Sequence, residues 1–443
     1  MPITFTRSIN LNSDYDVIIA GGGPAGCAAA TASARAGAKT LIIETASALG
    51  GMGTIGLIPA WCPFSDGEKI IYSGIAQEIF ESLKSHMPHI SQTETDWVPI
   101  DPEALKRLYD DLVESAGVDV LFNTFVCGVE FSDEVLHNVV VSNKAGLSAY
   151  EAKIFVDCTG DADIAALCGL GFRYGTTSGD VQPITHCFQL TNVDEYAYHS
   201  GPELHSSFRD CPVYDIVRSE KYPLVTDGHS CNSLIGPRTV GFNAGHLWDV
   251  HANDQLGVSK ALIQGRRLAH QFHQGLKEFY PKAYAASFLS ATASVMGIRE
   301  SRRIIGEYEL TLEDYITRRS FSDGIGRNCY FIDIHLAANE REKSNKGQFD
   351  IEHRYESYGP GESHGIPFRC LLPQKAKNLL VAGRTISCDR PVQASIRVMP
   401  VCLVTGQAAG TAAAMAANNG QDTKSLDITK LRAKLSKDGA YLL

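Results

Sequence analysis

Three glycines near the start of the chain, Gly21, Gly23 and Gly26, have the spacing G-x-G-x-x-G. In this pattern the first glycine permits a tight turn, the second lets a phosphate approach the backbone, and the third lets a helix pack closely on a strand. An apolar run, residues 16–20, precedes the motif, and an alanine-rich run, residues 26–36, follows it. The motif therefore predicts a strand, a turn and a helix whose N-terminus faces a pyrophosphate.

A carboxylate stands at the end of the next predicted strand. Residues 40–43 are apolar, and Glu44 follows them 18 residues after Gly26. A carboxylate at this place can accept hydrogen bonds from the hydroxyl groups of an adenosine ribose, and it disfavours a 2′-phosphate. A glycine-rich turn alone could be a plain structural connection. Strand, helix, second strand and terminal acid together predict dinucleotide binding.

Three later segments favour a flavin as the reactive part of the dinucleotide. Residues 50–54 form a second glycine-rich stretch soon after Glu44, and residues 159–161 end a strand near the middle of the chain. Residues 378–382 read as a strand followed by Gly383 and Arg384, and this segment precedes a helix beginning near Pro400. The positive N-terminus of such a helix would stabilise negative charge near N1 and the C2 carbonyl of a reduced flavin.

The cofactor-binding residues predicted from these segments share the three glycine-rich turns, the acid and the final helix start. They are Gly21, Gly23, Pro24, Ala25, Gly26, Glu44, Gly50, Gly51, Met52, Gly53, Thr54, Gly160, Asp161, Gly383, Arg384, Arg397, Val398 and Met399.

Three arginines, Arg299, Arg302 and Arg303, stand at positions i, i+3 and i+4 of a predicted helix, because residues 283–305 have helix-like apolar spacing. On such a helix they would share a face that could hold an anionic substrate or a cofactor phosphate. The alternative is a solvated helix end whose charge is compensated by glutamates such as Glu300.

The predicted catalytic residues are Arg299, His186, His335 and Arg397. Arg397 and Arg384 flank the expected flavin edge, although either could instead pair with a nearby carboxylate. Histidine is the default acid or base near neutral pH, although a lone histidine can equally be structural. None of the twelve cysteines forms a C-x-x-C pair, so the sequence predicts buried thiols and no metal site.

The chain resembles the FAD-dependent oxidoreductases that share the glutathione-reductase-like FAD-binding fold. The matching residues are 16–26, 50–54, 101–103, 157–161, 297–303, 378–384 and 395–400. The resemblance implies FAD bound along a crevice, with an inserted domain covering the isoalloxazine. Related disulfide reductases carry two cysteines where this chain has Gly53 and Ile58, and no second G-x-G-x-x-G is present. Hydride transfer between a small organic substrate and flavin N5, with a separate electron acceptor or donor, is therefore expected.

The predicted fold class is α/β, with a discontinuous Rossmann-like FAD-binding domain over residues 14–173 and 375–430. An inserted α+β substrate or cap domain is expected over residues 174–374, where histidines, aromatics and prolines become frequent. Asp101 followed by Pro102 predicts a helix start. Residues 135–149 predict a hairpin.

Composition limits the expected partners. A net charge of -10 leaves no broad positive surface for nucleic acid or an anionic membrane. The first thirteen residues contain no apolar stretch of the length of a secretory signal, which predicts a cytoplasmic protein. Residues 398–417 are apolar but rich in Ala and Gly, which favours a closely packed helix over a membrane span. The expected partners are a small-molecule substrate, for which an anion is one candidate, and an unidentified electron acceptor or donor. A homo-oligomer is left open.

Two other functions fit the dinucleotide motif. One is an ADP-moiety-binding synthase resembling thiazole synthases, in which a cysteine donates sulfur. The other is a non-catalytic binding module resembling the prenyl-GTPase dissociation inhibitors. The glycine-rich residues 50–54 and residues 383–400 count against both, because neither function needs a helix end that faces a flavin.

Overall fold

A five-stranded parallel sheet forms the centre of the computed structural model, which describes residues 3–4, 6–208, 210–345 and 355–443. The strand order is β17-β8-β2-β3-β4. The strands are β2 (Val17–Ala20), β3 (Thr40–Ile43), β4 (Asp119–Leu121), β8 (Ile154–Asp157) and β17 (Leu379–Val381). β2, β3, β8 and β17 are buried at every position, which explains their continuous apolar runs. The parallel sheet with its flanking helices confirms the predicted α/β class.

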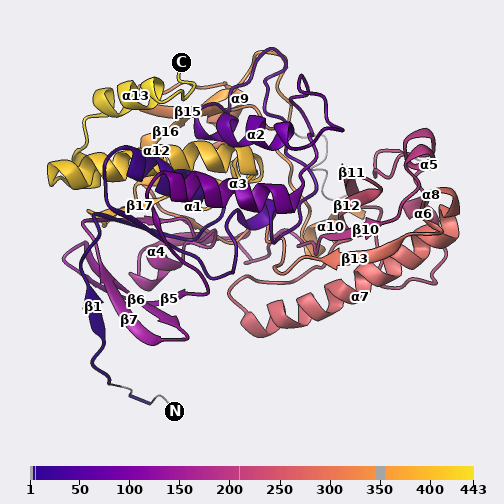
Figure 1. The fold of residues 1–443 in the computed structure, drawn as a ribbon, viewed down its shortest axis with the longest axis horizontal. Helices are drawn as coiled ribbons and strands as arrows, with labels where there is room; N and C mark the ends of the chain where they lie inside the picture. The colour runs from indigo at the N-terminus through magenta and orange to yellow at the C-terminus, as the bar shows by residue number, and fades with distance from the viewer. Residues whose placement is uncertain (1–2, 5, 209, 346–354) are drawn as a thin grey trace.

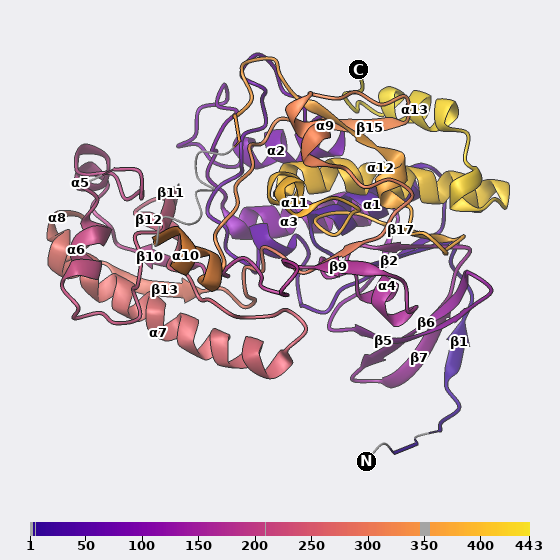
Figure 2. The ribbon, with the colours of Figure 1, turned by 180° about the vertical axis from the view of Figure 1, so that it is seen from behind.

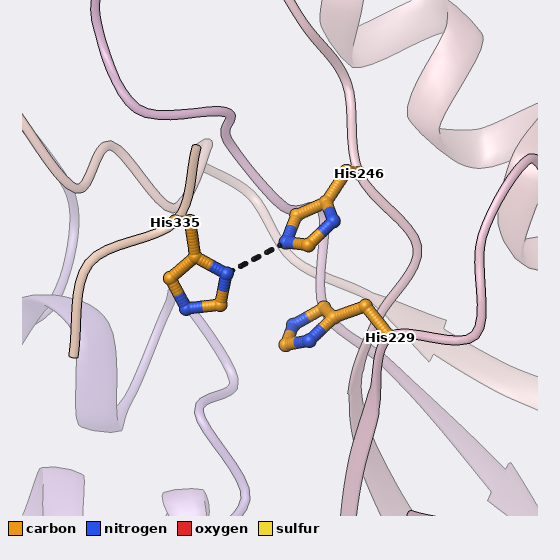
Figure 3. A group of neighbouring side chains, drawn as sticks. All are labelled: His229, His246 and His335. Carbon is orange, nitrogen blue, oxygen red and sulfur yellow. Dashed lines mark hydrogen bonds between the residues drawn. The ribbon is translucent and has the colours of Figure 1, made fainter. Parts of the chain in front are cut away.

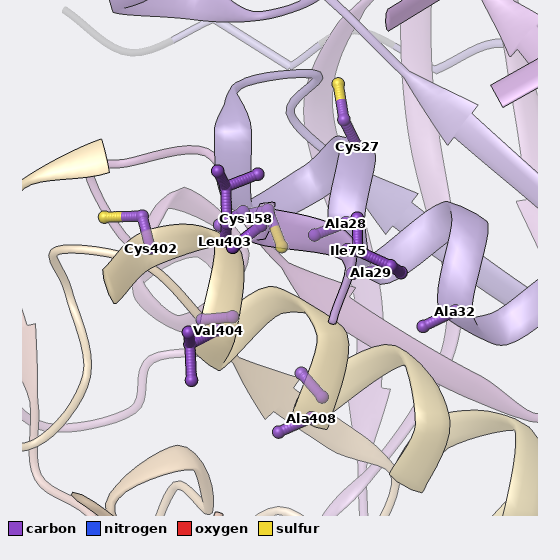
Figure 4. Packing of buried hydrophobic residues seen from close by; sticks show 14 of the residues in the cluster. Cys27, Ala28, Ala29, Ala32, Ile75, Cys158, Cys402, Leu403, Val404 and Ala408 are labelled. Carbon is purple, nitrogen blue, oxygen red and sulfur yellow. The ribbon is translucent and has the colours of Figure 1, made fainter. Parts of the chain in front are cut away.

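Two long helices, α1 (Pro24–Arg35) and α12 (Met399–Asn419), pack against each other beside this sheet (Figure 1). Their backbones approach each other at two glycines of α12. Figure 4 shows buried side chains of both helices in this core, among them Ala28 and Ala29 of α1 and Val404 and Ala408 of α12. A Cβ added at Gly406 would lie 2.1 Å from the carbonyl oxygen of Ala25, and one at Gly410 would lie 1.9 Å from that of Ala29. Only glycine permits this approach.

In the described part of the chain, α12 is the one helix long and apolar enough to cross a membrane, and 94% of its most apolar window is buried inside the fold. The prediction of a closely packed helix at this place is therefore confirmed. The helix is apolar because both of its sides face protein.

Replacing Gly410 with alanine should lower the free energy of unfolding by about 1–3 kcal/mol, because the added methyl group must push α12 away from α1. Chemical denaturation followed by circular dichroism measures the change. Gly236→Ala is the matched control, since a Cβ there meets no atom within 4 Å. Equal midpoints for the two variants would contradict the close approach of the helices.

The remaining elements of the unit that contains the five-stranded sheet lie around that sheet. A second sheet, ordered β1-β7-β6-β5, contains the predicted hairpin, and Asp101 caps α3 by accepting hydrogen bonds from two backbone N–H groups, which confirms that helix start. The bounds are β1 (Asn10–Asn12), α2 (Ile75–Ser85), α3 (Pro102–Ser115), β5 (Phe125–Ser132), β6 (Val135–Asn143), β7 (Gly146–Glu151), α4 (Asp163–Leu167), α11 (Arg390–Ile396) and α13 (Ile428–Lys437).

A second unit with its own apolar core projects from the first and is seen from behind in Figure 2. Its antiparallel sheet has the order β11-β12-β10-β13 and packs against α7. Its elements are β10 (Phe188–Thr191), α5 (Glu195–Ser200), α6 (Pro212–Arg218), β11 (Ser230–Gly236), β12 (Thr239–Ala244), α7 (Gln255–Phe279), α8 (Pro281–Tyr284) and β13 (Phe288–Thr292). We call this unit the cap.

The chain after the cap returns to the first unit. Leu310, Tyr315, Ile366 and Phe368 all lie in the same apolar core as α1 and α12. The elements here are β14 (Arg302–Ile304), α9 (Leu312–Ile316), β15 (Gly324–Asn328), α10 (Ala338–Asn345) and β16 (His364–Pro367). The domain boundaries at residues 173/174 and 374/375 stay a prediction, and within residues 174–374 only the part through β13 supplies the cap core.

The predicted helix over residues 283–305 is wrong. The segment contains the short helix α8, the cap strand β13, an extended stretch, and β14, which pairs with β9 (Phe172–Tyr174). The apolar spacing resembled a helix, but β10 and β9 offer backbone hydrogen bonds that this segment completes as strands. Such pairing partners lie more than 90 residues away, so local spacing could not reveal them.

Candidate functional site

The glycine turn between β2 and α1 has the geometry that a pyrophosphate needs. Gly21 has a φ of +94°, and a Cβ there would lie 2.4 Å from the carbonyl oxygen of Cys158. A Cβ at Gly26 would lie 1.7 Å from the carbonyl oxygen of Gly21, whereas a Cβ at Gly23 would meet no atom within 4 Å. No side chain caps the N-terminus of α1, so its first N–H groups are free to bind an anion in the open space beside Gly23.

Glu44 lies at the end of β3 with 8% of its surface exposed. One carboxylate oxygen accepts a hydrogen bond from the backbone N–H of Gly22 at 2.5 Å, and the other accepts from Ala46 N–H at 2.7 Å and the Thr45 hydroxyl at 3.0 Å. A carboxylate offers about four lone-pair positions, so capacity remains for a ribose hydroxyl. The position fits the predicted ribose contact.

The other predicted cofactor segments, though distant in sequence, meet around the first turns of α1 and α12. Four glycines lie so close to another segment that an added Cβ would approach its atoms to within about 3 Å. The distances from the added Cβ are 3.1 Å for Gly51 to Gly23 Cα, 3.2 Å for Gly53 to Met399 Sδ, 3.1 Å for Gly160 to the Arg384 guanidinium, and 3.2 Å for Gly383 to Ala25 Cβ. A cradle of this kind fits an extended dinucleotide. The binding role of each residue stays a prediction.

The N-terminus of α12 is the end of the cradle expected to face a flavin. Val398 is its N-cap and makes no side-chain capping bond, so free N–H groups and the helix dipole are available there. The two arginines predicted at this edge are both paired. Arg384 lies 3.0 Å from Asp161, and Arg397 lies 3.1 Å from a carboxylate oxygen of Asp333.

The three arginines predicted to share one helix face do not do so, because their segment is extended. Arg302 pairs with Asp163 at 2.9 Å, and Arg303 pairs with the buried Glu300 at 2.9 Å. Arg299 makes no ion pair within the described residues. The prediction of a shared anion-binding face is therefore wrong for Arg302 and Arg303, whereas Arg299 remains a candidate.

Arg299 is a buried guanidinium held by neutral groups. It is 6% exposed, donates a hydrogen bond to the carbonyl oxygen of Pro183 at 2.8 Å, and donates another to Nε2 of His229 at 3.2 Å. Burial, together with the nearby Arg397, lowers the pKa of Arg299 to about 10. A buried cation without a carboxylate partner is costly, and a bound anion would compensate it.

Three histidines gather beside Arg299 from three separate segments (Figure 3). His229 immediately precedes β11, His246 follows β12, and His335 lies just before α10. One ring nitrogen of each lies within 4.8 Å of the others. The rings of His229 and His246 stack with centroids 4.1 Å apart, and Nε2 of His246 lies 3.0 Å from Nδ1 of His335.

A carboxylate lies at each end of the His246–His335 pair. Asp227 is 3.1 Å from Nδ1 of His246, and Asp333 is 3.3 Å from Nε2 of His335. Burial and the charge of Arg299 lower the pKa of His335 to about 3. Although burial acts to raise the pKa of Asp333, His335 and Arg397 hold it well below its usual range.

The structure brings three of the four predicted catalytic residues, Arg299, His335 and Arg397, into this one group. His186 lies elsewhere: its Nε2 is 2.8 Å from the carbonyl oxygen of Ala293, and its ring packs so closely on α7 that a Cβ at Gly265 would lie 2.6 Å from it. Burial lowers its pKa, and in the described part of the chain no hydrogen bond or ion pair joins it to Arg299, so we correct its predicted role to packing against α7.

Sequence reasoning missed His229, His246, Asp227 and Asp333. Asp333 stands two residues before the predicted His335, and Asp227 stands two residues before His229, so the D-x-H spacing was a local signal. No pattern in a single sequence joins these two pairs to each other or to His246. The prediction of buried thiols holds for most cysteines but not for Cys127, which is exposed. Burial raises the pKa of Cys62 and of Cys187 to about 12. All twelve cysteines are free.

Comparisons relate this chain to known protein families and solved structures. A family model described as FAD dependent oxidoreductase matches residues 16–435. Solved structures similar to the chain include a geranylgeranyl bacteriochlorophyll reductase-like protein from Thermoplasma acidophilum, with 13% identity over 97% of this chain and 83% of that chain and a TM-score of 0.48. They also include p-nitrophenol 4-monooxygenase from Pseudomonas putida, with 13% identity, coverage of 97% and 84% and a TM-score of 0.47. A flavin-dependent brominase has 14% identity, coverage of 95% and 83% and a TM-score of 0.47. No curated protein matched the sequence.

Proposed function

The chain belongs to the family of FAD-dependent oxidoreductases, and on that premise we propose that it transfers hydride between a small anionic organic substrate and N5 of FAD. A separate electron acceptor or donor would complete the cycle. FAD is the cofactor, and the cradle around the first turns of α1 and α12 fits it. When bound, FAD supplies the hydride acceptor or donor.

The observation that carries the proposal is the buried Arg299, which has no carboxylate within ion-pair distance in the described part of the chain, although Asp333 acts on its charge from further away. Its planar guanidinium presents several donors in a fixed fork, which suits a carboxylate on the substrate. The acceptor nitrogen of His229 takes one donor and so fixes the orientation of the fork. The substrate class we infer is therefore a small organic acid.

Arg299 also lies close to the expected flavin edge. Asp333 links the histidine group to Arg397 at 3.1 Å, and Arg397 immediately precedes the N-cap of α12. Gln393 of α11 donates a hydrogen bond to the backbone carbonyl of Arg299 at 2.8 Å. This bond holds the segment around Arg299 against α11, which directly precedes Arg397 and α12. These contacts support a substrate held between the cap and the cofactor cradle.

The family assignment favours this enzyme over the two other functions that the dinucleotide motif allowed. An ADP-moiety-binding synthase would need a cysteine as sulfur donor, but burial raises the pKa of the thiols near Arg299. A non-catalytic module would not need a buried arginine that lacks a direct ion pair at the expected cofactor edge. No observation favours either alternative.

The test is a visible spectrum followed by a substrate screen. The purified protein should show flavin bands and release FAD on acid precipitation. Under anaerobic conditions, small organic acids should be screened for bleaching of the flavin, each beside its neutral amide. We expect bleaching by an acid and not by its amide. Bleaching by both members equally would contradict the anionic substrate, and a colourless protein that takes up no FAD would contradict the cofactor.

A further inference from the structure

Four side chains form a continuous chain of contacts across the boundary between the cap and the first unit. In order they are Asp227, His246, His335 and Asp333, joined at 3.1, 3.0 and 3.3 Å. These side chains are mostly buried, the most exposed being Asp333 at 29%. Each contact in such a chain needs one donor and one acceptor, because a buried polar group that lacks its hydrogen bond destabilises the fold.

Counting the protons shows what this geometry requires. An ionised carboxylate only accepts, so Nδ1 of His246 and Nε2 of His335 must each carry a hydrogen to bond Asp227 and Asp333. The two facing nitrogens, 3.0 Å apart, then need one hydrogen between them. With both rings neutral, these nitrogens would present two lone pairs to each other. A chain in which all three contacts are hydrogen bonds would therefore need three hydrogens on four nitrogens, which is one imidazolium shared by the pair.

The groups around the pair oppose that extra proton when the site is empty of an anion. Burial and Arg299 lower the pKa of His335 to about 3, and burial lowers the pKa of His246. An anion at Arg299 would cancel the nearest positive charge and so raise the proton affinity of the pair. The charged and titratable groups that face the pair or border its carboxylates are Asp227, His229, Arg299, Asp333, Arg341 and Arg397, with Tyr330, Cys62 and Cys231 beside Asp333.

A metal ion on the three imidazoles would be the other use of this group, but Arg299 argues against it. Its guanidinium donates a hydrogen bond to Nε2 of His229 at 3.2 Å, so a cation already occupies that acceptor. A second cation at the centre of the three rings would face this charge directly. The trio is better matched to an anion and a proton.

We propose that an anionic ligand at Arg299 binds together with one proton, which the His246–His335 pair takes up between Asp227 and Asp333. The inference rests on the proposed function in one respect only, the binding of an anion at Arg299. The charge brought by the anion is compensated by the proton, and Asp227 and Asp333 act as positioning residues that fix the ring tautomers. The pair then stores a proton close to the substrate.

The linkage has a definite sign. Because binding raises the pKa of the pair, proton uptake strengthens binding at pH values between the pKa of the free pair and that of the complex. In that window the Kd of the anion should rise about tenfold for each unit by which the pH is raised, because one proton is taken up per ligand. Above the pKa of the complex the dependence ends.

The experiment is isothermal titration of the oxidised holoenzyme with malonate, and separately with sulfate, from about pH 5 to 8. Each titration is performed in two buffers that differ in ionisation enthalpy, so that the difference in heat gives the number of protons taken up. We expect uptake that approaches about one proton as the pH is lowered. Asp227→Asn and His246→Gln should still bind malonate, with at most a small fraction of this uptake. Asp215→Asn, an exposed aspartate of the cap, is the matched control and should behave as wild type.

The outcomes separate this inference from the proposed function. Binding of malonate with equal heats in both buffers would overturn the coupled proton and leave an anion site at Arg299. Failure of both malonate and sulfate to bind the wild type would overturn both. Uptake of Co²⁺ with visible ligand-field bands that disappear in His246→Gln would also overturn the inference, because the imidazoles would then be metal ligands. Proton uptake by wild type and Asp215→Asn, lost in the other two variants, supports it.

Discussion

Replacement of Arg299 by glutamine should lower kcat/KM for an acidic substrate by about 10²–10³-fold while FAD stays bound. This decrease in kcat/KM corresponds to a loss of about 3–4 kcal/mol of transition-state stabilisation. A loss of this size is typical when one partner of a buried charged contact is removed. The guanidinium is 6% exposed and bonds Pro183 and His229, so glutamine keeps the packing but loses the charge. Steady-state kinetics with an acid found by flavin bleaching, together with the flavin spectrum, provide the measurement.

Two further variants make this result specific. Arg299→Lys keeps the charge but not the fork, so it should recover only part of the loss. Arg173→Gln removes an exposed arginine that pairs with Glu309 and should leave kcat/KM within about twofold of wild type. If Arg299→Gln retained full activity with intact FAD, the substrate would not be held by this side chain.

The second large effect concerns Glu300, whose side chain is fully buried. It pairs with Arg303 at 2.9 Å and Arg390 at 3.1 Å, and it accepts the backbone N–H of Gln182 at 3.1 Å. Glu300→Ala would leave two guanidinium groups without this carboxylate. The free energy of unfolding should fall by about 3–5 kcal/mol. Chemical denaturation of the holoenzyme, followed by circular dichroism, measures it.

The matched control for Glu300→Ala is Glu309→Gln, which breaks a surface ion pair with Arg173. Its unfolding free energy should change by at most about 1 kcal/mol. A difference of less than about 1 kcal/mol between the two variants would show that the buried network contributes no more than a surface pair. Glu300 directly follows Arg299 in the chain. The stability of the Glu300 network therefore also bears on how firmly the backbone at Arg299 is held.

The turn at Gly21 illustrates which features a single sequence predicts well. Glycine spacing, a preceding apolar run and a following acid are local features, and sterics give them one local solution. The same holds for α12, whose small residues permit the close approach to α1 at Gly406 and Gly410. Strands β2 and β3 were predicted nearly to their ends because both faces of the sheet are covered and almost every position is apolar.

Residues 283–305 illustrate where local patterns are insufficient. Apolar spacing predicted a helix with three arginines on one face, but strand partners far along the chain drew β13 and β14 into sheets. Two of the arginines consequently became structural, while Arg299 stayed buried with no direct ion pair among the residues that the structure describes. Secondary structure here was decided by hydrogen-bond partners that the segment itself does not contain.

The sequence by itself determined the α/β class and the glycine turn between β2 and α1, because both depend on the sterics and polarity of neighbouring residues. Only the tertiary structure decided which side chains lie together near Arg299. It joined Asp227, His246, His335 and Asp333 from distant segments and assigned His186 to packing. The physical reason is that proton-sharing and charge compensation depend on distances of about 3 Å, and the folded chain alone brings such groups that close.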